Sequence, residues 1–279
     1  MKPAPFAYRR PGSLAEAVAT LAGEPGAKVL AGGQSLVPLL SMRLAAPSVL
    51  VDINGVPGLD AVEVDDAGVR VGALARHAAV LASDDVRRVQ PLVPMALAHV
   101  AHATIRNRGT TVGSLVHADA AAEMPVVLTL LGGSLDVEGP SGRRTIPADQ
   151  LYVGPLESSV RADEIAVSAW FPALPAGASV AFDEVSRRHG DYALVGAAAL
   201  VEDDRVRVGY LSVADVPTVV DLTGVADDDL GEAALEHLDP ADDIHATAAY
   251  RAQLVRVLTR RVVGRARVSR QARQPKDMR

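Results

Sequence analysis

The sequence predicts an α+β protein in which a part with alternating strands and helices precedes a small antiparallel sheet with helices. Between residues 28 and 53, a short apolar run, a stretch with helical spacing and a second apolar run follow one another, as in a β-α-β unit. Beyond residue 178, three longer runs rich in valine and alanine are separated by polar turns, which is typical of antiparallel strands.

Elements of the first part follow from local signals. Ser13 and Glu16 have the spacing of a capping box, and helical periodicity continues to Gly23. The elements expected next are a strand at 28–31, a helix at 35–44, a strand at 48–53, a hairpin turning at 65–68, helices within 76–103 broken by Pro91 and Pro94, a helix from 123 to a glycine pair at 132–133, a hairpin turning at 140–142 and a strand at 163–171.

The composition changes after the segment PALPAGAS at residues 172–179, and a domain boundary is expected at residues 172–177. Strands are expected at 179–187, 193–202 and 205–213, followed by helices at about 229–238 and 244–263. In the last helix, Tyr250, Leu254, Val257 and Leu258 are expected to share one face. The residues from 265 to 279 hold six basic side chains and one acid, and they are expected to form a disordered tail.

Bulk properties exclude several classes of function. The net charge is −6, whereas a nucleic-acid-binding domain usually shows a basic surface. The chain has no cysteine, so it forms no disulfide and holds no thiolate metal site or iron–sulfur cluster by itself. No apolar run approaches the roughly 20 residues of a membrane-spanning helix, and the first residues lack the core of a signal peptide. These features favour a cytoplasmic protein of one large or two modest domains.

A first glycine-containing loop lies in the sequence KVLAGGQSLVPLL at residues 28–40. Gly32 and Gly33 separate the expected strand from the expected helix, and Gln34 and Ser35 follow directly. Exposed N–H groups in such a turn, next to a helix start, favour an anion. Glycine is expected here because a Cβ atom would keep a phosphate away and because such turns often need a positive φ. Ser35 is expected both to cap the helix and to bind the phosphate.

A second loop lies in TIRNRGTTVGSLVHADAAAEMP at residues 104–125, where Gly109 and Gly113 flank two threonines and a valine. Two separate anion-binding turns fit one elongated ligand, such as a diphosphate between a nucleoside and another aromatic group. Neither loop has the Gly-x-Gly-x-x-Gly pattern of a Rossmann fold, and no P-loop motif occurs. Nearby histidines, including His77 and His117, are expected to have structural roles, as is one of Arg106 and Arg108. The sequence offers no catalytic constellation and no metal site.

Together the two loops resemble motifs of the FAD-binding (medium) subunits of molybdenum hydroxylases, the family of aerobic carbon monoxide dehydrogenases and of the xanthine dehydrogenase flavin domain. LAGGQSLVPLL resembles the first flavin motif and IRNRGTTVGSLVHADAAAEMP the second. RRHGDYALVGAAA, at 187–199, and DDIHATAAYRAQLVRVLTRR, at 242–261, resemble two further family patterns. The four motifs occur in order and span nearly the whole chain.

The resemblance implies a PCMH or vanillyl-alcohol-oxidase type of fold, in which two subdomains enclose FAD and a C-terminal α+β domain follows. On this chain it implies an FAD-binding domain at residues 1–174, with subdomains at about 1–55 and 56–174, and a C-terminal domain at 175–264. The cofactor-binding residues that it implies are Val29, Leu30, Ala31, Gly32, Gly33, Gln34, Ser35, Thr110, Thr111, Gly113, Ser114, Glu123, Ile165 and Tyr192.

Three positions depart from the family pattern. Val112 replaces a glycine of the second motif, and a β-branched residue would fit poorly if this position required a positive φ. Asp183 and Glu184 stand near Phe182, where many relatives carry a lysine. Ala120 replaces the proline that usually follows the motif aspartate.

The resemblance also implies a function. The chain would carry FAD, accept electrons from the 2Fe-2S clusters of a small subunit and pass them to an external acceptor such as NAD, a quinone or oxygen. A large molybdopterin subunit would act on the substrate, in a heterotrimer that pairs into a heterohexamer. Two alternatives remain open at this point: a stand-alone FAD-dependent oxidase or reductase of the same fold, and a non-catalytic module that retains the fold.

Overall fold

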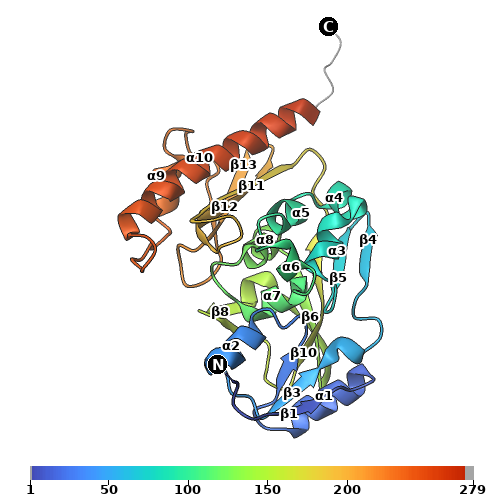
Figure 1. Ribbon diagram of the computed structural model, residues 1–279. Helices are drawn as coiled ribbons and strands as arrows, with labels where there is room; N and C mark the ends of the chain where they lie inside the picture. The colour runs from blue at the N-terminus through green and yellow to red at the C-terminus, as the bar shows by residue number, and fades with distance from the viewer. Residues whose placement is uncertain (1, 274–279) are drawn as a thin grey trace.

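The computed structural model describes residues 2–273, and its N-terminal lobe is a small parallel sheet with two helices (Figure 1). Strands β1 (Ala7–Arg9) and β2 (Lys28–Leu30) lie on either side of β3 (Val49–Asp52), and both pairs are parallel. Helices α1 (Leu14–Gly23) and α2 (Leu36–Met42) connect them. The predicted β-α-β unit is confirmed, whereas β1 was not predicted from the sequence.

An antiparallel sheet of five strands forms the centre of the molecule, in the order β4-β5-β10-β6-β7. The two predicted hairpins are β4 (Val62–Asp65) with β5 (Gly68–Gly72), and β6 (Ser134–Gly139) with β7 (Gly142–Pro147). Strand β10 (Ile165–Pro172) lies between them and pairs with one strand of each. The minor elements are η1 (Ile53–Gly55), η2 (Ala148–Gln150), β8 (Tyr152–Gly154) and β9 (Glu157–Ser158).

Short helices cover this sheet between β5 and β6. They are α3 (His77–Ala82), α4 (Asp84–Val89), α5 (Leu92–Leu97), α6 (Ala103–Arg106), α7 (Thr111–His117) and α8 (Glu123–Leu131). The prediction that Pro94 breaks a helix is wrong. Pro94 is the third residue of α5, where its missing N–H would have had no helical partner.

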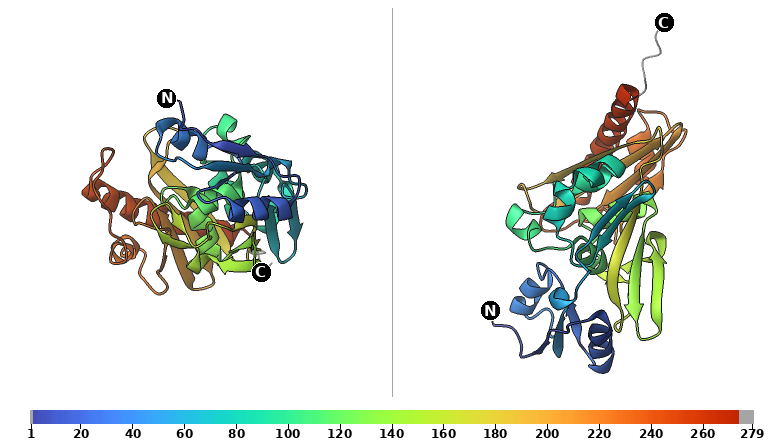
Figure 2. Two further views of the ribbon diagram at one scale, coloured as in Figure 1. Left: turned by 90° about the horizontal axis from the view of Figure 1, so that it is seen from below. Right: turned by 90° about the vertical axis from the view of Figure 1, so that its right-hand side faces the viewer.

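The C-terminal part is an antiparallel sheet in the order β11-β12-β13-β14 with helices on both faces (Figure 2). Its elements are β11 (Ser179–Ser186), β12 (Ala193–Glu202), β13 (Arg205–Leu211), β14 (Thr218–Asp221), α9 (Leu230–Leu235) and α10 (Ala248–Arg273). Helix α10 packs on β11 and β12, and α8 packs on β12, β13 and β14. Because both faces are covered, β12 is buried almost throughout, which explains its continuous apolar sequence.

Strand β12 joins two hydrophobic clusters. Ala198 and Leu200 belong to the large central cluster, whereas Ala197, Ala199 and Val201 belong to the cluster beneath α10. Side chains of a strand alternate between its faces, so one strand serves both clusters. The predicted boundary at 172–177 falls in the segment between β10 and β11, but the central cluster continues across it. The division into residues 1–174 and 175–264 therefore stays a prediction.

Two expectations about the chain end need correction. Residues 265–273 continue α10 instead of forming a disordered tail, and Ala266 is fully buried in the cluster beneath this helix. The remainder of the predicted tail, 274–279, lies outside the described residues. The face expected for the last helix is also partly wrong. Leu254 and Leu258 are buried, but Tyr250 and Val257 are 47% and 39% exposed.

Candidate functional site

The first glycine loop connects β2 to α2, and its backbone donors are free. The N–H groups of residues 32–36 donate to no acceptor in the part of the chain that the structure describes. Gly33 has φ +74°, the left-handed conformation that favours glycine, and its carbonyl accepts from the Val37 N–H at 2.9 Å. Consecutive unpaired N–H groups around a left-handed glycine are typical of backbone that binds an anion.

Ser35 precedes α2, but its side chain makes no capping hydrogen bond, so that part of the expectation is wrong. Its backbone is already helical, which turns the hydroxyl away from the N–H groups that an extended N-cap residue would reach. Gln34 bends back instead, and its Nε2 donates to the Gly32 carbonyl at 3.1 Å. The Ser35 hydroxyl is consequently available to a ligand.

The second loop leads into α7, and most of its side-chain polar groups are already engaged. Thr110 caps the helix, and its Oγ1 accepts from the Gly113 N–H at 3.1 Å. Thr111 is fully buried, with its Oγ1 3.2 Å from Nδ1 of His77 and its N–H bonded to the Ala75 carbonyl. The Ser114 hydroxyl has no partner among the described residues, and the same holds for the N–H groups of Thr110 and Val112.

Val112 is well accommodated although it replaces a glycine of the family pattern. It lies in the first turn of α7, is not among the residues with positive φ, and is 2% exposed in the central hydrophobic cluster. No left-handed conformation is required at this position, so the β-branched side chain costs no backbone strain.

The two loops are in direct backbone contact. A Cβ atom at Gly32 would overlap the Arg108 carbonyl and lie 2.9 Å from Cα of Gly109. A Cβ atom at Gly109 would lie 2.9 Å from Cδ2 of His77. The expected reason for glycine at these positions was room for a phosphate. The structure shows a further reason: at Gly32 the absence of a Cβ lets the two loops approach each other, and at Gly109 it leaves room for the His77 ring.

The remaining implied residues are more dispersed. Glu123 begins α8 and is 6% exposed, and burial together with the nearby Glu184 raises its pKa to about 8. Tyr192 lies between β11 and β12 and is 57% exposed, and partial burial with the charge of Asp119 raises its pKa to about 12. Ile165 is the first residue of β10 and is 1% exposed in the central hydrophobic cluster. Its burial lends no support to a ligand contact.

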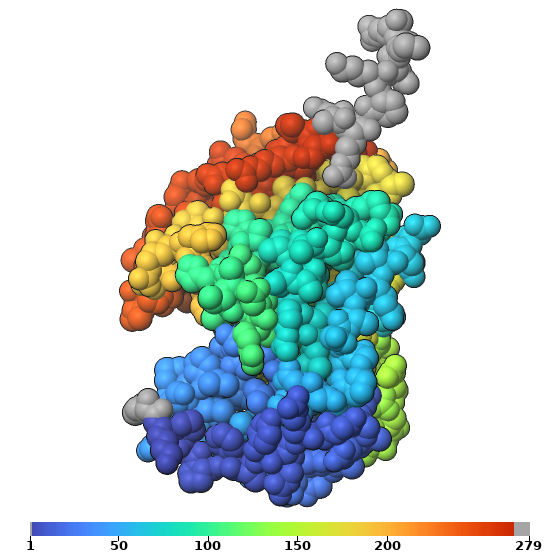
Figure 3. All heavy atoms as spheres, turned by 45° about the vertical axis from the view of Figure 1, so that its right-hand side comes forward, coloured from blue at the N-terminus to red at the C-terminus, as the bar shows by residue number. Residues whose placement is uncertain are grey.

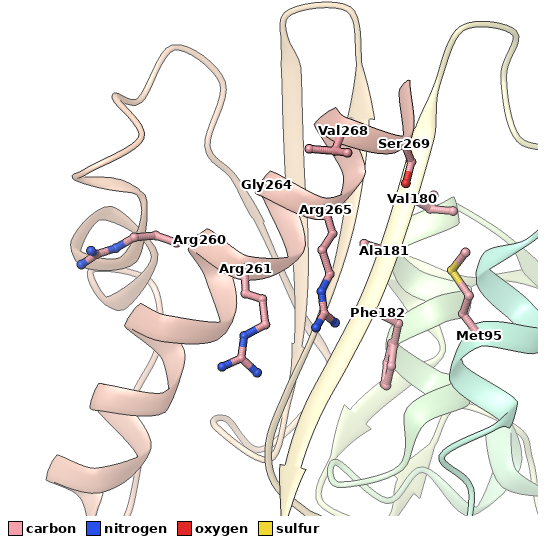
Figure 4. A pocket seen from close by; sticks show the side chains of 10 residues that line it. All are labelled: Met95, Val180, Ala181, Phe182, Arg260, Arg261, Gly264, Arg265, Val268 and Ser269. Carbon is pink, nitrogen blue, oxygen red and sulfur yellow. The ribbon is translucent and has the colours of Figure 1, made fainter. Parts of the chain in front are cut away.

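Two pockets lie outside the loops. One of about 670 Å³ includes Asp119, Tyr192 and Arg251 in its lining. Another of about 610 Å³ lies where α10 approaches β11 and α5 (Figure 4). In it Arg261 and Arg265 extend from α10, and both pair with Asp183 at 3.0 Å. The surface is also indented between the N-terminal lobe, in blue, and the green and gold segments above it (Figure 3).

Sequence reasoning missed two residues beside the loops, Asn54 and Arg76. Arg76 Nη1 donates to the Arg108 carbonyl at 2.7 Å, and Asn54 Nδ2 donates to the Ala31 carbonyl at 2.9 Å. Neither residue belongs to a recognisable motif. The only local signal is that each lies within four residues of the end of a mainly apolar strand, β3 for Asn54 and β5 for Arg76. Arg106, by contrast, has the expected structural role, since its Nη1 binds the carbonyls of Val100 and Ala101 at 2.8 Å.

These donors fit the diphosphate of FAD. The site offers consecutive N–H groups from one loop, N–H groups from the second, two free serine hydroxyls and the guanidinium groups of Arg76 and Arg108 nearby. Within residues 2–273, no group of three acidic, histidine or cysteine side chains could hold a metal ion. In the same range no helix is long and apolar enough to cross a bilayer.

Two family models match nearly the whole chain. Residues 4–174 match the family model described as FAD binding domain in molybdopterin dehydrogenase, and residues 180–266 match the CO dehydrogenase flavoprotein C-terminal domain. The alpha subunit of the 6-hydroxypseudooxynicotine dehydrogenase complex of Paenarthrobacter nicotinovorans is 42% identical over 95% of this chain and 96% of the relative. The medium chain of carbon monoxide dehydrogenase from Hydrogenophaga pseudoflava is 31% identical over 95% and 98%.

Solved structures show the same similarity. A chain of quinoline 2-oxidoreductase from Pseudomonas putida 86 superposes with a TM-score of 0.90 at 36% identity, covering 97% of this chain and 99% of the other. A chain of carbon monoxide dehydrogenase from Hydrogenophaga pseudoflava superposes with a TM-score of 0.91 at 30% identity, again covering 97% and 99%.

Proposed function

Because the chain belongs to the family of FAD-binding subunits of molybdenum hydroxylases, an oxidoreductase family, we propose that it accepts electrons from the 2Fe-2S clusters of a partner subunit and passes them to an external acceptor. The proposed assembly has a small 2Fe-2S subunit and a large molybdopterin subunit, as a heterotrimer that pairs into a heterohexamer. The proposed location is the cytoplasm.

The observation that carries the proposal is the contact between the two glycine loops. Their unpaired N–H groups belong to one site instead of two, so a single diphosphate can accept hydrogen bonds from residues 32–36 and from the second loop. The Ser35 and Ser114 hydroxyls add one donor from each loop. The positive charges of Arg76 and Arg108 favour an anion at this place.

The other residues proposed to line the cofactor contribute shape and polarity. Residues 29–31 and Gln34 border the first loop, and Thr110, Thr111 and Gly113 shape the second. Tyr192 presents a partly exposed ring, and Glu123 presents a carboxyl whose raised pKa keeps it largely protonated near neutral pH. A protonated carboxyl can donate a hydrogen bond to a hydroxyl of the cofactor. Bound FAD itself supplies both one-electron and two-electron redox chemistry.

Co-purification of the tagged chain from its native source tests the proposal. We expect about one FAD per chain, together with molybdenum and iron held by two partner subunits. Addition of the substrate of the complex without an acceptor should bleach the flavin absorbance. A flavin-free complex would contradict the proposal. A chain that purifies alone with FAD and turns over a substrate without partners would support the stand-alone oxidase or reductase instead.

A further inference from the structure

Asn54 and Arg76 link the two glycine loops to each other. Arg76 Nη2 donates to Asn54 Oδ1 at 2.7 Å, so the two side chains form a continuous bridge. At one end Asn54 binds the carbonyl of Ala31, and at the other Arg76 binds the carbonyl of Arg108. Each of these carbonyls belongs to the residue directly before a loop glycine. The bridge therefore acts on both loops at the point where they touch.

The orientation of the Asn54 amide is fixed by Asp52. The Asp52 carboxylate accepts from the Asn54 backbone N–H at 2.9 Å and from Asn54 Nδ2 at 2.6 Å. Burial disfavours the charge on Asp52, but hydrogen bonds from Tyr8 and Asn54 outweigh it and hold the pKa of this carboxyl below its usual range. A carboxylate only accepts hydrogen bonds, so the amide must turn Nδ2 towards Asp52 and Ala31 and its oxygen towards Arg76.

The positive charge of Arg76 and Arg108 at this bridge has no direct ion-pair partner among the described residues. Burial and the neighbouring charge of Arg108 lower the pKa of Arg76, and the charges of Asp52 and Asp60 raise it by smaller amounts. An anionic ligand lying on the two loops would supply a direct ion-pair partner.

We propose that Asn54 and Arg76 are positioning residues that hold the two glycine loops at the spacing FAD requires, so that their loss weakens FAD binding without unfolding the chain. The inference rests on the proposed placement of the diphosphate on these loops. Arginine is suited to this role because its planar fork donates to two acceptors in fixed directions, which a single ammonium group cannot do.

The test measures the FAD dissociation constant of the full-length apoprotein by quenching of flavin fluorescence, together with the melting temperature of each apoprotein. We expect Arg76→Lys and Asn54→Ala each to weaken FAD binding about 10- to 100-fold, the range that follows from losing hydrogen bonds to a charged or buried group. Arg76→Lys keeps the charge and most of the side-chain stem, so it separates positioning from electrostatic attraction.

Arg70→Lys is the matched control. Arg70 is another partly exposed arginine with two polar partners, Asp136 and Ser168, but it lies on the central sheet. Its FAD dissociation constant should stay within about twofold of the wild type. The double variant Asn54→Ala with Arg76→Lys should bind no more weakly than the weaker single variant, because the two residues act as one unit.

The outcomes separate this inference from the proposed function. If wild-type apoprotein binds FAD and both single variants bind it within about twofold, with or without a lower melting temperature, the bridge is only structural and the inference is overturned. Additive losses in the double variant would also overturn it. If the wild type itself binds no FAD, the proposed function fails first.

Discussion

Single residues decide how closely the two loops can approach. Gly32 and Gly109 are required by contacts within the protein, whereas Gly33 is required by its own conformation. The distinction matters for mutagenesis. A side chain at Gly32 forces two backbones apart, but a side chain at Gly33 changes only the first loop, because its nearest neighbours would be Val37 and Leu30 at 3.2 and 3.3 Å.

Gly33→Val is expected to weaken FAD binding at least tenfold while the chain stays folded. A left-handed backbone costs about 1–2 kcal/mol for a residue with a Cβ, so the loop would relax and misdirect its donors. Gly224→Val is the matched control, because Gly224 has φ +77° and open space around it away from the loops. Flavin absorbance of both variants measures how much FAD they retain, and circular dichroism shows whether they stay folded. Stoichiometric FAD on Gly33→Val would argue against the assignment of the loop.

Glu123 is expected to make stability depend on pH. Its pKa of about 8 in the folded protein lies above the ordinary 4.5, so the folded state holds an extra proton between these values. The contribution of this proton to the free energy of unfolding is fully present below about pH 4.5 and is lost as the pH rises towards 8. The free energy of unfolding then falls with a limiting slope of about 1.4 kcal/mol per pH unit. Besides Glu184, the charged groups that face it are His99 and Asp119.

Urea unfolding of the apoprotein and of Glu123→Gln between pH 5 and 8 measures this effect. The amide cannot ionise, so the variant should gain stability relative to the wild type as pH rises. Burial also lowers the pKa of His77 to about 4, so His77 adds its own pH dependence to both proteins. The informative quantity is therefore the difference in the free energy of unfolding between the two proteins. An equal pH dependence in both proteins would show that Glu123 is not the group responsible.

Among the secondary-structure elements, α10 is held in place by a buried arginine. Arg251 is 6% exposed and donates to the carbonyls of Leu194 and Ser212 and to the carboxylate of Asp243. These bonds tie the first turn of the helix to the ends of β12 and β13. The helix therefore depends on a polar anchor as well as on its apolar face.

Arg251→Met is expected to destabilise the protein by about 2–4 kcal/mol, because it leaves two carbonyl groups without a donor. Arg256→Met serves as control on the same helix. Within residues 2–273, Arg256 pairs with Glu232 alone, near the surface, so its loss should change stability little. Chemical denaturation of both variants gives the comparison. Equal effects would show that the anchor adds nothing to an exposed ion pair.

At the scale of the whole molecule, bound FAD is expected to contact both the N-terminal lobe and the central part of the protein. Hydrogen exchange should slow on addition of FAD at the amides of residues 32–36, Thr110 and Val112, because these N–H groups gain acceptors. The exposed turn at Asp203 and Asp204 should show no change. The melting temperature should also rise, because FAD at a hundredfold excess over its dissociation constant adds about 2.7 kcal/mol to the free energy of unfolding. Unchanged exchange in both loops would contradict the site.

The local sequence was sufficient for the elements with strong periodicity or clear turns. The β-α-β unit, both hairpins, the three long C-terminal strands and the helix from Glu123 to the glycine pair were predicted within a few residues. The short strands β1 and β14 were missed. The helical course of residues 265–273 was missed because its charge pattern resembles a tail, whereas packing of Ala266 under the sheet stabilises it.

The two glycine loops, the class of ligand and the family were apparent from residue types and their order along the chain, because glycine, serine and threonine at turns have direct backbone consequences. The contact between the loops, the bridge of Asn54 and Arg76, and the burial of Glu123 depend on residues far apart in the chain. Such contacts follow from how the parts of the chain pack together, and no local pattern encodes a hydrogen bond between residues 22 positions apart.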